Sequence, residues 1–263
     1  MLTLRSGPVH VRSFGVGQPV LCLHATGHDG SDFAPLAARI GDRYGLHALD
    51  FPGQGQSPAS GVPPRASAYA DIALEACAAL GLEHPIVIGN SIGGAAAILA
   101  AHRAPRSIRA VVLCNPGGLA PIDATARVAI GFMVAFFAAG ARGAPWFETA
   151  FAAYYSALVL PRAPQRRRAI ITQSRALAPL LAEAWRGFAQ PDADLRAIAS
   201  ALPVPVWCAW ARDDRLVSWA RAKAAVRRIP SGRATLFRGG HAAFLEDSDQ
   251  FAAAFDSFVR DLQ

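Results

Sequence analysis

Lysine is almost absent from this chain, although the chain is strongly basic. Lys223 is the only lysine among 26 basic residues, and the formal net charge is +7 at pH 7. The one dense arginine run, Arg166-Arg167-Arg168, is typical of a solvated helix face. No base-stacking motif or known binding module accompanies this charge, so we expect no nucleic-acid partner.

Cysteine is also scarce, and the first residues do not combine a basic stretch with an apolar run. We therefore expect no signal peptide. The four cysteines are widely spaced, and three of them fall in predicted strands: Cys22, Cys77, Cys114 and Cys208. This spacing fits no metal site and is typical of buried, reduced thiols. These features predict a cytoplasmic protein that uses no metal or other cofactor.

A hydrophobic run long enough to cross a membrane is not evident either. The most apolar stretch, residues 128–139, has about a dozen residues, whereas a spanning helix needs about 20. We expect no membrane span. No pattern in the sequence predicts an oligomeric state.

Short apolar strands alternate with helices along most of the chain. Strands are predicted near residues 20–24, 46–50, 86–90, 109–114, 204–210 and 233–238, and helices near 31–41, 66–80, 92–103, 219–228 and 248–261. Residues 8–17 predict an antiparallel hairpin at the sheet edge. Such alternation predicts an α/β fold, with a mostly parallel sheet flanked by helices on both faces. Functional groups then belong at the carboxyl ends of the strands.

Residues 118–199 interrupt this alternation with a helical pattern that is broken by prolines. We interpret this segment as a helical cap inserted into a core whose two parts are residues 1–117 and 200–263. The cap is rich in aromatic side chains, most of which we expect to bury it against the core. Candidates for lining a substrate pocket are Phe132, Phe136 and Trp146.

The most informative local pattern is Gly89-Asn90-Ser91-Ile92-Gly93. An apolar, β-branched strand precedes it, and an alanine-rich helix follows. A strand that becomes a helix within one residue strains that residue and exposes its side chain at the top of the sheet. The pattern therefore predicts that Ser91 is a nucleophile.

A serine hydroxyl needs a base, oriented by an acid, before it reacts. In this architecture both follow the serine along the chain, with the acid first. Asp213 and Asp214 follow the predicted strand at 204–210, and His241 follows the strand at 233–238. All of these residues fall at the carboxyl ends of strands.

At these positions the chain resembles the α/β-hydrolase superfamily. Residues 20–27 look like the strand that ends in His-Gly-x, and residues 49–57 match the D-x-P-G-x-G-x-S turn. Residues 240–246 are close to the G-H-x-x-x-L-E block. With the serine turn and the acid segment, five blocks follow the family order. Where the family usually has glycine after the first histidine, this chain has Ala25.

The resemblance implies roles for three side chains. Ser91 would be the nucleophile and His241 the general base. The family pattern G-x-x-D-x-x-V maps onto residues 211–217 and makes Asp214 the acid, with Asp213 as the competing assignment.

The resemblance also places the oxyanion hole at the backbone N–H groups of Thr26 and Ile92. His24 would fix the loop, and His28 is either a pocket residue or a solvated loop residue. Asn90 and Asn115 are further possible pocket or strand-end residues without an assigned role.

The function that this set predicts is hydrolysis of a carboxylic ester or thioester of a small to medium apolar substrate, through an acyl-enzyme on Ser91. One alternative is hydrolysis of a carbon–carbon bond in a vinylogous diketone. Relatives with that activity carry a glycine-rich oxyanion loop and an aromatic residue after the base, where this chain has Ala25 and Ala242. The other alternative is a non-hydrolytic member of the fold: a lyase, a cofactor-free oxygenase or a ligand receptor.

Overall fold

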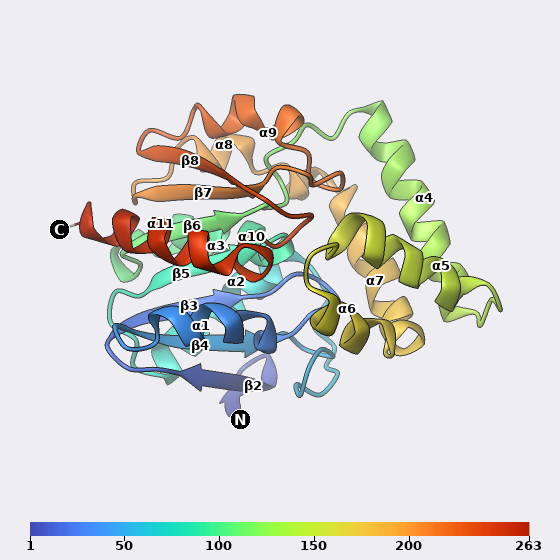
Figure 1. The fold of residues 1–263 in the computed structure, drawn as a ribbon, viewed down its shortest axis with the longest axis horizontal. Coiled ribbons are helices and arrows are strands. Elements are labelled where there is room, and N and C mark those ends of the chain that lie inside the picture. The colour runs from blue at the N-terminus through green and yellow to red at the C-terminus, as the bar shows by residue number, and fades with distance from the viewer. Residues whose placement is uncertain (263) are drawn as a thin grey trace.

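An eight-stranded sheet forms the centre of the molecule in a computed structural model that describes residues 1–262 (Figure 1). The strands are β1 (Leu2–Leu4), β2 (Gly7–Phe14), β3 (Gln18–Leu23), β4 (Tyr44–Asp50), β5 (Ile86–Asn90), β6 (Ala110–Cys114), β7 (Val206–Ala211) and β8 (Gly232–Phe237). Their spatial order is β1-β2-β4-β3-β5-β6-β7-β8. Strands β3 to β8 pair in parallel, which confirms the mostly parallel sheet.

An antiparallel hairpin does lie at the amino-terminal edge of the sheet, but β1 and β2 form it over residues 2–14, so the expected bounds of 8–17 are wrong. Strand β2 is a single strand that pairs antiparallel with β1 on one side and with β4 on the other. Gly15 and Gly17 then turn the chain into β3 with φ angles of +70° and +108°. A Cβ atom on Gly15 would lie 2.3 Å from the carbonyl oxygen of Gly41, so this close approach requires glycine.

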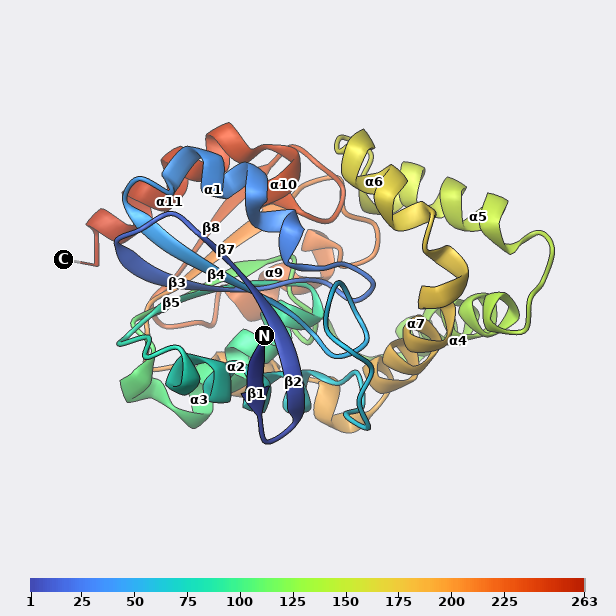
Figure 2. The ribbon, with the colours of Figure 1, turned by 90° about the horizontal axis from the view of Figure 1, so that it is seen from below.

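Helices cover both faces of the sheet, because successive side chains of each strand point to opposite faces. In β3, Val20 and Cys22 belong to one hydrophobic cluster, and Leu21 and Leu23 belong to the other. Figure 2 shows the two layers of helices on either side of the strands. One cluster includes residues of α1 (Ala34–Ile40), α10 (Ala243–Glu246) and α11 (Ser248–Arg260), and the other includes residues of α2 (Ala66–Ala79), α3 (Ile92–Arg103) and α9 (Trp219–Val226).

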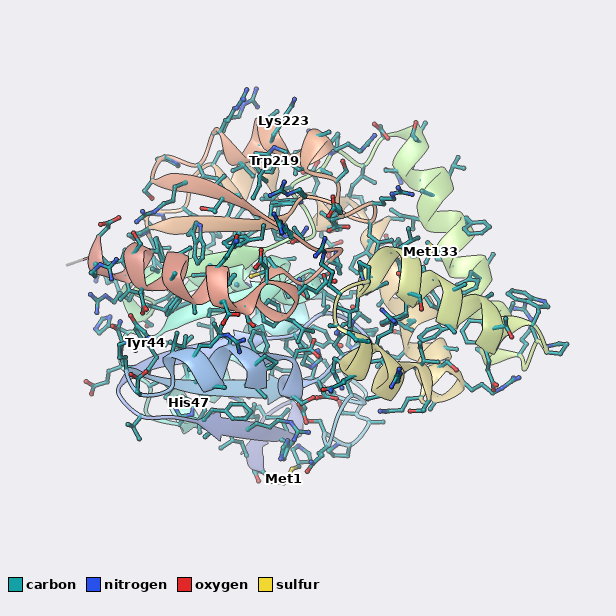
Figure 3. The ribbon with its side chains drawn as sticks, in the orientation of Figure 1. Met1, Tyr44, His47, Met133, Trp219 and Lys223 are labelled. Carbon is teal, nitrogen blue, oxygen red and sulfur yellow. The ribbon has the colours of Figure 1, made fainter. Side chains whose placement is uncertain are left out.

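A helical insertion leaves the sheet after β6 and returns to it at β7, after slightly more than a third of the chain. Its elements are α4 (Ala124–Ala141), α5 (Phe147–Tyr154), the π-helix Tyr155–Val159, α6 (Pro164–Ile171), α7 (Ser174–Phe188), the short 3₁₀ turn Pro191–Ala193 and α8 (Arg196–Ala199). Figure 3 shows Met133, on α4, at the opposite end of the molecule from Tyr44, which begins β4. The insertion therefore lies beyond the carboxyl ends of the strands.

Helix α4 is longer than the apolar stretch of about a dozen residues suggested. Asp123 caps it, accepting a hydrogen bond from the Ala126 N–H at 2.9 Å, so a polar first turn extends the helix to 18 residues. By length and composition alone, α4 could cross a membrane. It packs along α7 instead, although only Phe137 and Gly140 in it are buried.

All four cysteines are buried, and none forms a disulfide. Burial raises the pKa of the Cys77 thiol to about 11 and that of Cys208 to about 12. Thiols in this state are weak nucleophiles at neutral pH, because the thiolate is the reactive form.

Candidate active site

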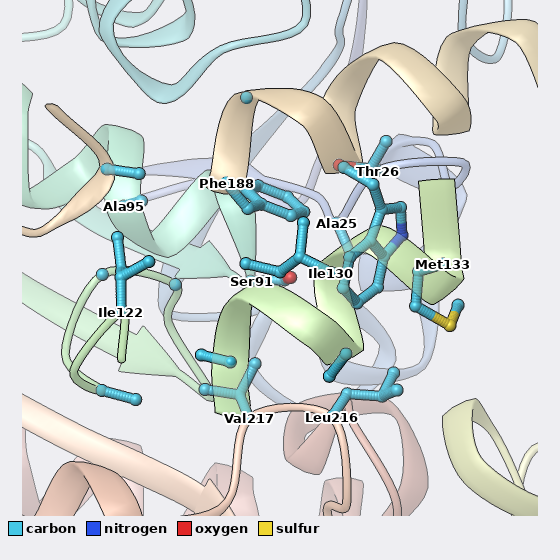
Figure 4. Close-up of a pocket in the computed structure, with 18 of the residues that line it drawn as sticks. Ala25, Thr26, Ser91, Ala95, Ile122, Ile130, Met133, Phe188, Leu216 and Val217 are labelled. Carbon is cyan, nitrogen blue, oxygen red and sulfur yellow. The ribbon is translucent and has the colours of Figure 1, made fainter. Parts of the chain in front are cut away.

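Ser91 forms the turn between β5 and α3. Its φ of 55° and ψ of −116° lie where non-glycine residues are rarely found. Gly89 and Gly93 make this turn possible, because a Cβ atom on either residue would lie 2.3 Å from a backbone oxygen. Figure 4 shows the Ser91 side chain inside a cavity, with Phe188 on one side and Val217 on the other.

His241 lines the same cavity and forms a buried pair with Asp214. The Nδ1 atom of His241 lies 2.8 Å from Oδ2 of Asp214, and both residues are 5% exposed. A carboxylate only accepts hydrogen bonds, so Nδ1 of His241 is the donor. In the neutral ring, Nε2 is then an acceptor, as a general base requires.

Both carboxylate oxygens of Asp214 accept two hydrogen bonds. Its Oδ1 atom accepts the backbone N–H groups of Leu216 at 2.7 Å and Val217 at 2.9 Å. Its Oδ2 atom accepts the side-chain amide of Asn115 at 2.6 Å in addition to the ring of His241. The neighbouring Asp213 is exposed, so the two adjacent carboxylates differ in their surroundings.

Asn115 has a positioning role that the sequence did not reveal. Its φ of 44° is unusual for a residue other than glycine, and it lies directly after β6. It donates to Asp214 and accepts the backbone N–H of Ala211, at the end of β7, at 2.9 Å. Asn90 makes a similar tie one strand further, donating to the carbonyls of Cys114 at 2.9 Å and His241 at 2.8 Å.

Competing effects set the proton affinity of His241. Burial alone would lower its pKa, because a low-dielectric site disfavours the charged ring. The charge of Asp214, its hydrogen bond to the ring and the charge of Glu246 together outweigh burial. The pKa of His241 is therefore raised above its ordinary value.

The loop after β3 is fixed by His24. The backbone N–H of Phe51 donates to Nε2 of His24 at 2.9 Å, so Nδ1 carries the proton and donates to the carbonyl of Ala25 at 2.7 Å. Burial lowers the pKa of His24, which keeps the ring neutral. The left-handed residue of this loop is Gly27, with a φ of 79°, and Ala25 is not among the residues of positive φ. An alanine therefore fits where the family usually has glycine.

The two predicted oxyanion donors lie in the loop after β3 and at the start of α3. Thr26 lines the cavity together with Ser91. Ile92 is the first residue of α3, and the first N–H groups of a helix have no partner within it. The adjacent Gly27 N–H donates to the Gln54 side chain at 2.6 Å, which helps hold the loop.

A buried ionic cluster joins this loop to the insertion. Arg166, on α6, pairs with Asp32 and, at 2.9 Å, with Asp29. Asp32 also pairs with Nδ1 of His28 at 2.6 Å, and the ring of His28 stacks on Tyr155 with centroids 5.8 Å apart. Burial would raise the pKa of Asp32, but the charges of His28 and Arg166 lower it below its usual value.

The loop that carries His241 is joined to the insertion as well. Glu246 accepts the backbone N–H groups of Gly240 at 2.7 Å and His241 at 3.2 Å, and with its other oxygen the N–H of Arg162 at 2.9 Å. Burial raises the pKa of Glu246, although these N–H donors oppose the shift. A Cβ atom on Gly240 would lie 2.5 Å from Pro161, so the two segments touch closely.

The cavity has a volume of about 660 Å³ and lies between the carboxyl ends of the strands and the insertion. Apolar side chains from both parts dominate its lining, including Ile122, Ile130, Met133, Leu181, Trp185, Phe188, Leu216 and Val217. The polar residues that line it include Ser91, His241, His28 and Thr26. Within residues 1–262, no three His, Cys, Asp or Glu side chains are grouped to hold a metal ion.

Two of the four predicted pocket residues lie elsewhere. His28 and Phe132 line the cavity, but Phe136 and Trp146 are not among its lining residues. Phe136 instead packs within the aromatic cluster of the insertion, 5.0 Å from Phe137 and 6.0 Å from Trp146 between ring centroids. Tyr154 and Tyr155 line the cavity in their place.

Residues 20–254 match the model of the alpha/beta hydrolase family. The chain belongs to this family. A pimeloyl-[acyl-carrier protein] methyl ester esterase from Stenotrophomonas maltophilia is 31% identical to this hydrolase over 269 residues, covering 97% of each chain. An esterase of the same name from Xanthomonas campestris is 30% identical over 256 residues, covering 95% of this chain and 98% of its own.

Solved structures of esterases share the fold of this hydrolase. The esterase from Thermogutta terrifontis superposes with a TM-score of 0.81 at 20% identity, covering 99% of this chain and 97% of that one. The esterase from Exiguobacterium antarcticum gives a TM-score of 0.82 at 18% identity and covers 98% of each chain.

Proposed function

We propose that this alpha/beta hydrolase is a serine esterase that cleaves carboxylic esters of small to medium apolar acids. The observation that carries the proposal is the buried His241–Asp214 pair, which lines the same apolar cavity as the strained Ser91. The esterases among the relatives support the same class of reaction.

In the proposed reaction, Nε2 of His241 takes the proton of the Ser91 hydroxyl as the oxygen attacks the ester carbonyl. The N–H groups of Thr26 and Ile92 stabilise the resulting oxyanion, and each such donor is worth about 3 kcal/mol. The protonated ring of His241 then gives its proton to the leaving alcohol, and the acyl group remains on Ser91. Water, activated by His241, releases the acid and restores the serine.

Asp214 acts through the ring of His241. It fixes the tautomer by accepting the Nδ1 proton, and its charge stabilises the imidazolium that forms during each half-reaction. Asn115, Leu216 and Val217 supply three donors that orient the Asp214 carboxylate.

A panel of substrates tests this function. The panel contains p-nitrophenyl esters, acyl thioesters, a pimeloyl-carrier-protein methyl ester, as the names of the relatives suggest, and a vinylogous diketone. We expect the purified protein to hydrolyse the esters and to lose this activity after treatment with a fluorophosphonate. Turnover of the diketone alone, or of no member of the panel, would contradict the proposal.

A further inference from the structure

Helix α4 presents an apolar face that no other part of the described chain covers. Val128 is 75% exposed and Phe132 is 70% exposed, and Ala135 is exposed one turn further along the same face. A Cβ atom on Gly131, beside them, would meet no atom within 4 Å. Large exposed apolar side chains that cluster in this way mark interaction surfaces.

The same face forms the rim of the cavity that contains Ser91. Val128, Phe132 and the neighbouring Met133 line the cavity, although the first two are mostly exposed. The apolar outside of α4 is therefore continuous with the apolar inside of the cavity. A molecule that rests against this face has a route to Ser91 along hydrophobic side chains.

Positive charge lies at both ends of the face and none lies within it. Residues 128–141 contain no ionisable side chain, while Arg127 precedes them and Arg142 follows. Within residues 1–262, neither arginine forms a salt bridge, whereas Asp123 and Glu148, the carboxylates flanking α4, are both paired with arginines. The face thus combines exposed hydrocarbon with cationic ends.

We propose that α4 docks this protein on the surface of an anionic phospholipid bilayer. The helix would lie in the plane of the interface over its length of about 27 Å, at 1.5 Å per residue. Val128, Phe132 and Ala135 would enter the acyl-chain region, and Arg127 and Arg142 would contact lipid phosphates. The opposite side of α4 packs on α7, so the helix lies on the membrane and does not cross it.

The charges favour a bilayer over a second copy of the chain. Two copies that paired their α4 faces about a two-fold axis, with the helices antiparallel, would bring Arg127 of one copy near Arg142 of the other. The carboxylates that flank α4 in sequence, Asp123 and Glu148, are already paired with other arginines, so they do little to relieve that repulsion. Anionic headgroups supply the missing charge around a hydrocarbon layer.

Vesicle flotation with the full chain tests this proposal, and it uses the Ser91→Ala variant so that binding is measured without hydrolysis. The vesicles contain phosphatidylcholine alone or an equal mixture of phosphatidylcholine and phosphatidylglycerol. We expect binding to the mixed vesicles, weaker binding to phosphatidylcholine alone, and a decrease with added salt. A Val128→Ser, Phe132→Ser double variant should bind at least about tenfold more weakly.

The matched control is Val16→Ser, because Val16 is 70% exposed but lies in the turn between β2 and β3, at the opposite end of the strands. This variant should bind vesicles as the parent does. Equal binding by the α4 double variant, or no binding to mixed vesicles, would overturn the proposal. So would sedimentation that shows self-association through α4 without vesicle binding. None of these outcomes depends on which ester, if any, the protein hydrolyses.

Discussion

The carboxyl ends of the strands and the inserted helices hold their side chains in different ways. At the carboxyl ends of the strands, several polar side chains are held by hydrogen bonds of defined length, as in the chain from Asn115 through Asp214 to His241. In the insertion, Phe132 faces solvent while Phe137, five residues further along α4, is fully buried. The polar residues at the strand ends are thus fixed by hydrogen bonds and a strained turn, whereas the apolar side chains of the insertion are placed by how its helices pack.

Removal of the Ser91 hydroxyl oxygen should have the largest effect on activity. In the proposed mechanism, Ser91→Ala deletes the only group that can form the acyl-enzyme, so kcat/KM should fall by about 10⁴-fold or more. The melting temperature should be unchanged. If the variant kept more than about a tenth of the parental kcat, Ser91 would not be the nucleophile.

The second change separates two adjacent carboxylates. Asp214→Asn keeps the shape of the side chain but removes the charge that orients His241, so kcat should fall by up to about 10⁴-fold. Asp213→Asn is the matched control, because Asp213 is exposed and next in sequence. Equal losses in the two variants, or a larger loss in Asp213→Asn, would show that the acid is wrongly assigned.

The insertion should affect substrate preference more gently. Each methylene that enters the apolar cavity should add about 0.8 kcal/mol, so kcat/KM should rise from acetate to octanoate esters. Phe132→Ala should reduce that preference by about tenfold or less, since Phe132 is largely exposed. Trp146→Ala, which alters an aromatic side chain outside the cavity lining, should leave the preference unchanged. A steady fall in kcat/KM with chain length would mean that the cavity does not receive the acyl chain.

The smallest expected effect is a displacement of the pH profile. Activity requires neutral His241, and because its pKa is raised, the acid limb should have its midpoint above the ordinary histidine value of about 6.5. Glu246→Gln removes a negative charge that favours the protonated ring, so the midpoint should move to lower pH. Glu148→Gln is the control, because Glu148 lies on the surface and pairs with Arg175. A midpoint that stays fixed in Glu246→Gln would contradict the electrostatic role of Glu246.

Local patterns in the sequence were enough to predict the parallel sheet and to locate Ser91, Asp214 and His241 at strand ends. Their catalytic roles stay predictions until they are tested. The sequence pointed to Asn115 but could not assign its role, because its partners, Ala211 and Asp214, lie almost a hundred residues further along the chain. No local pattern reports such a distant contact.

The positions of the aromatic side chains in the insertion were harder to predict. Phe132, Phe136 and Phe137 lie within two turns of α4, yet one faces solvent, one fills the aromatic cluster and one is fully buried. Which of them reaches the cavity depends on how α4, α5 and α7 pack, and hydrophobicity alone does not encode this. The prediction failed for Phe136 and Trp146 for this reason.

Contacts between the insertion and the rest of the chain are stronger at some points than at others, and this decides where the structure can open. Arg166 ties it to Asp29 and Asp32 by largely buried ion pairs, and the backbone N–H of Arg162 ties it to Glu246. The start of α4 is held by the exposed Asp123–Arg221 pair, a kind of contact that stabilises little. Local opening begins where buried contacts are fewest, so amide hydrogens near the start of α4 should exchange faster than those around Arg166. The cavity would then widen by movement of α4, which lines its entrance, while the segment around Arg162 and Arg166 stays in place beside His241.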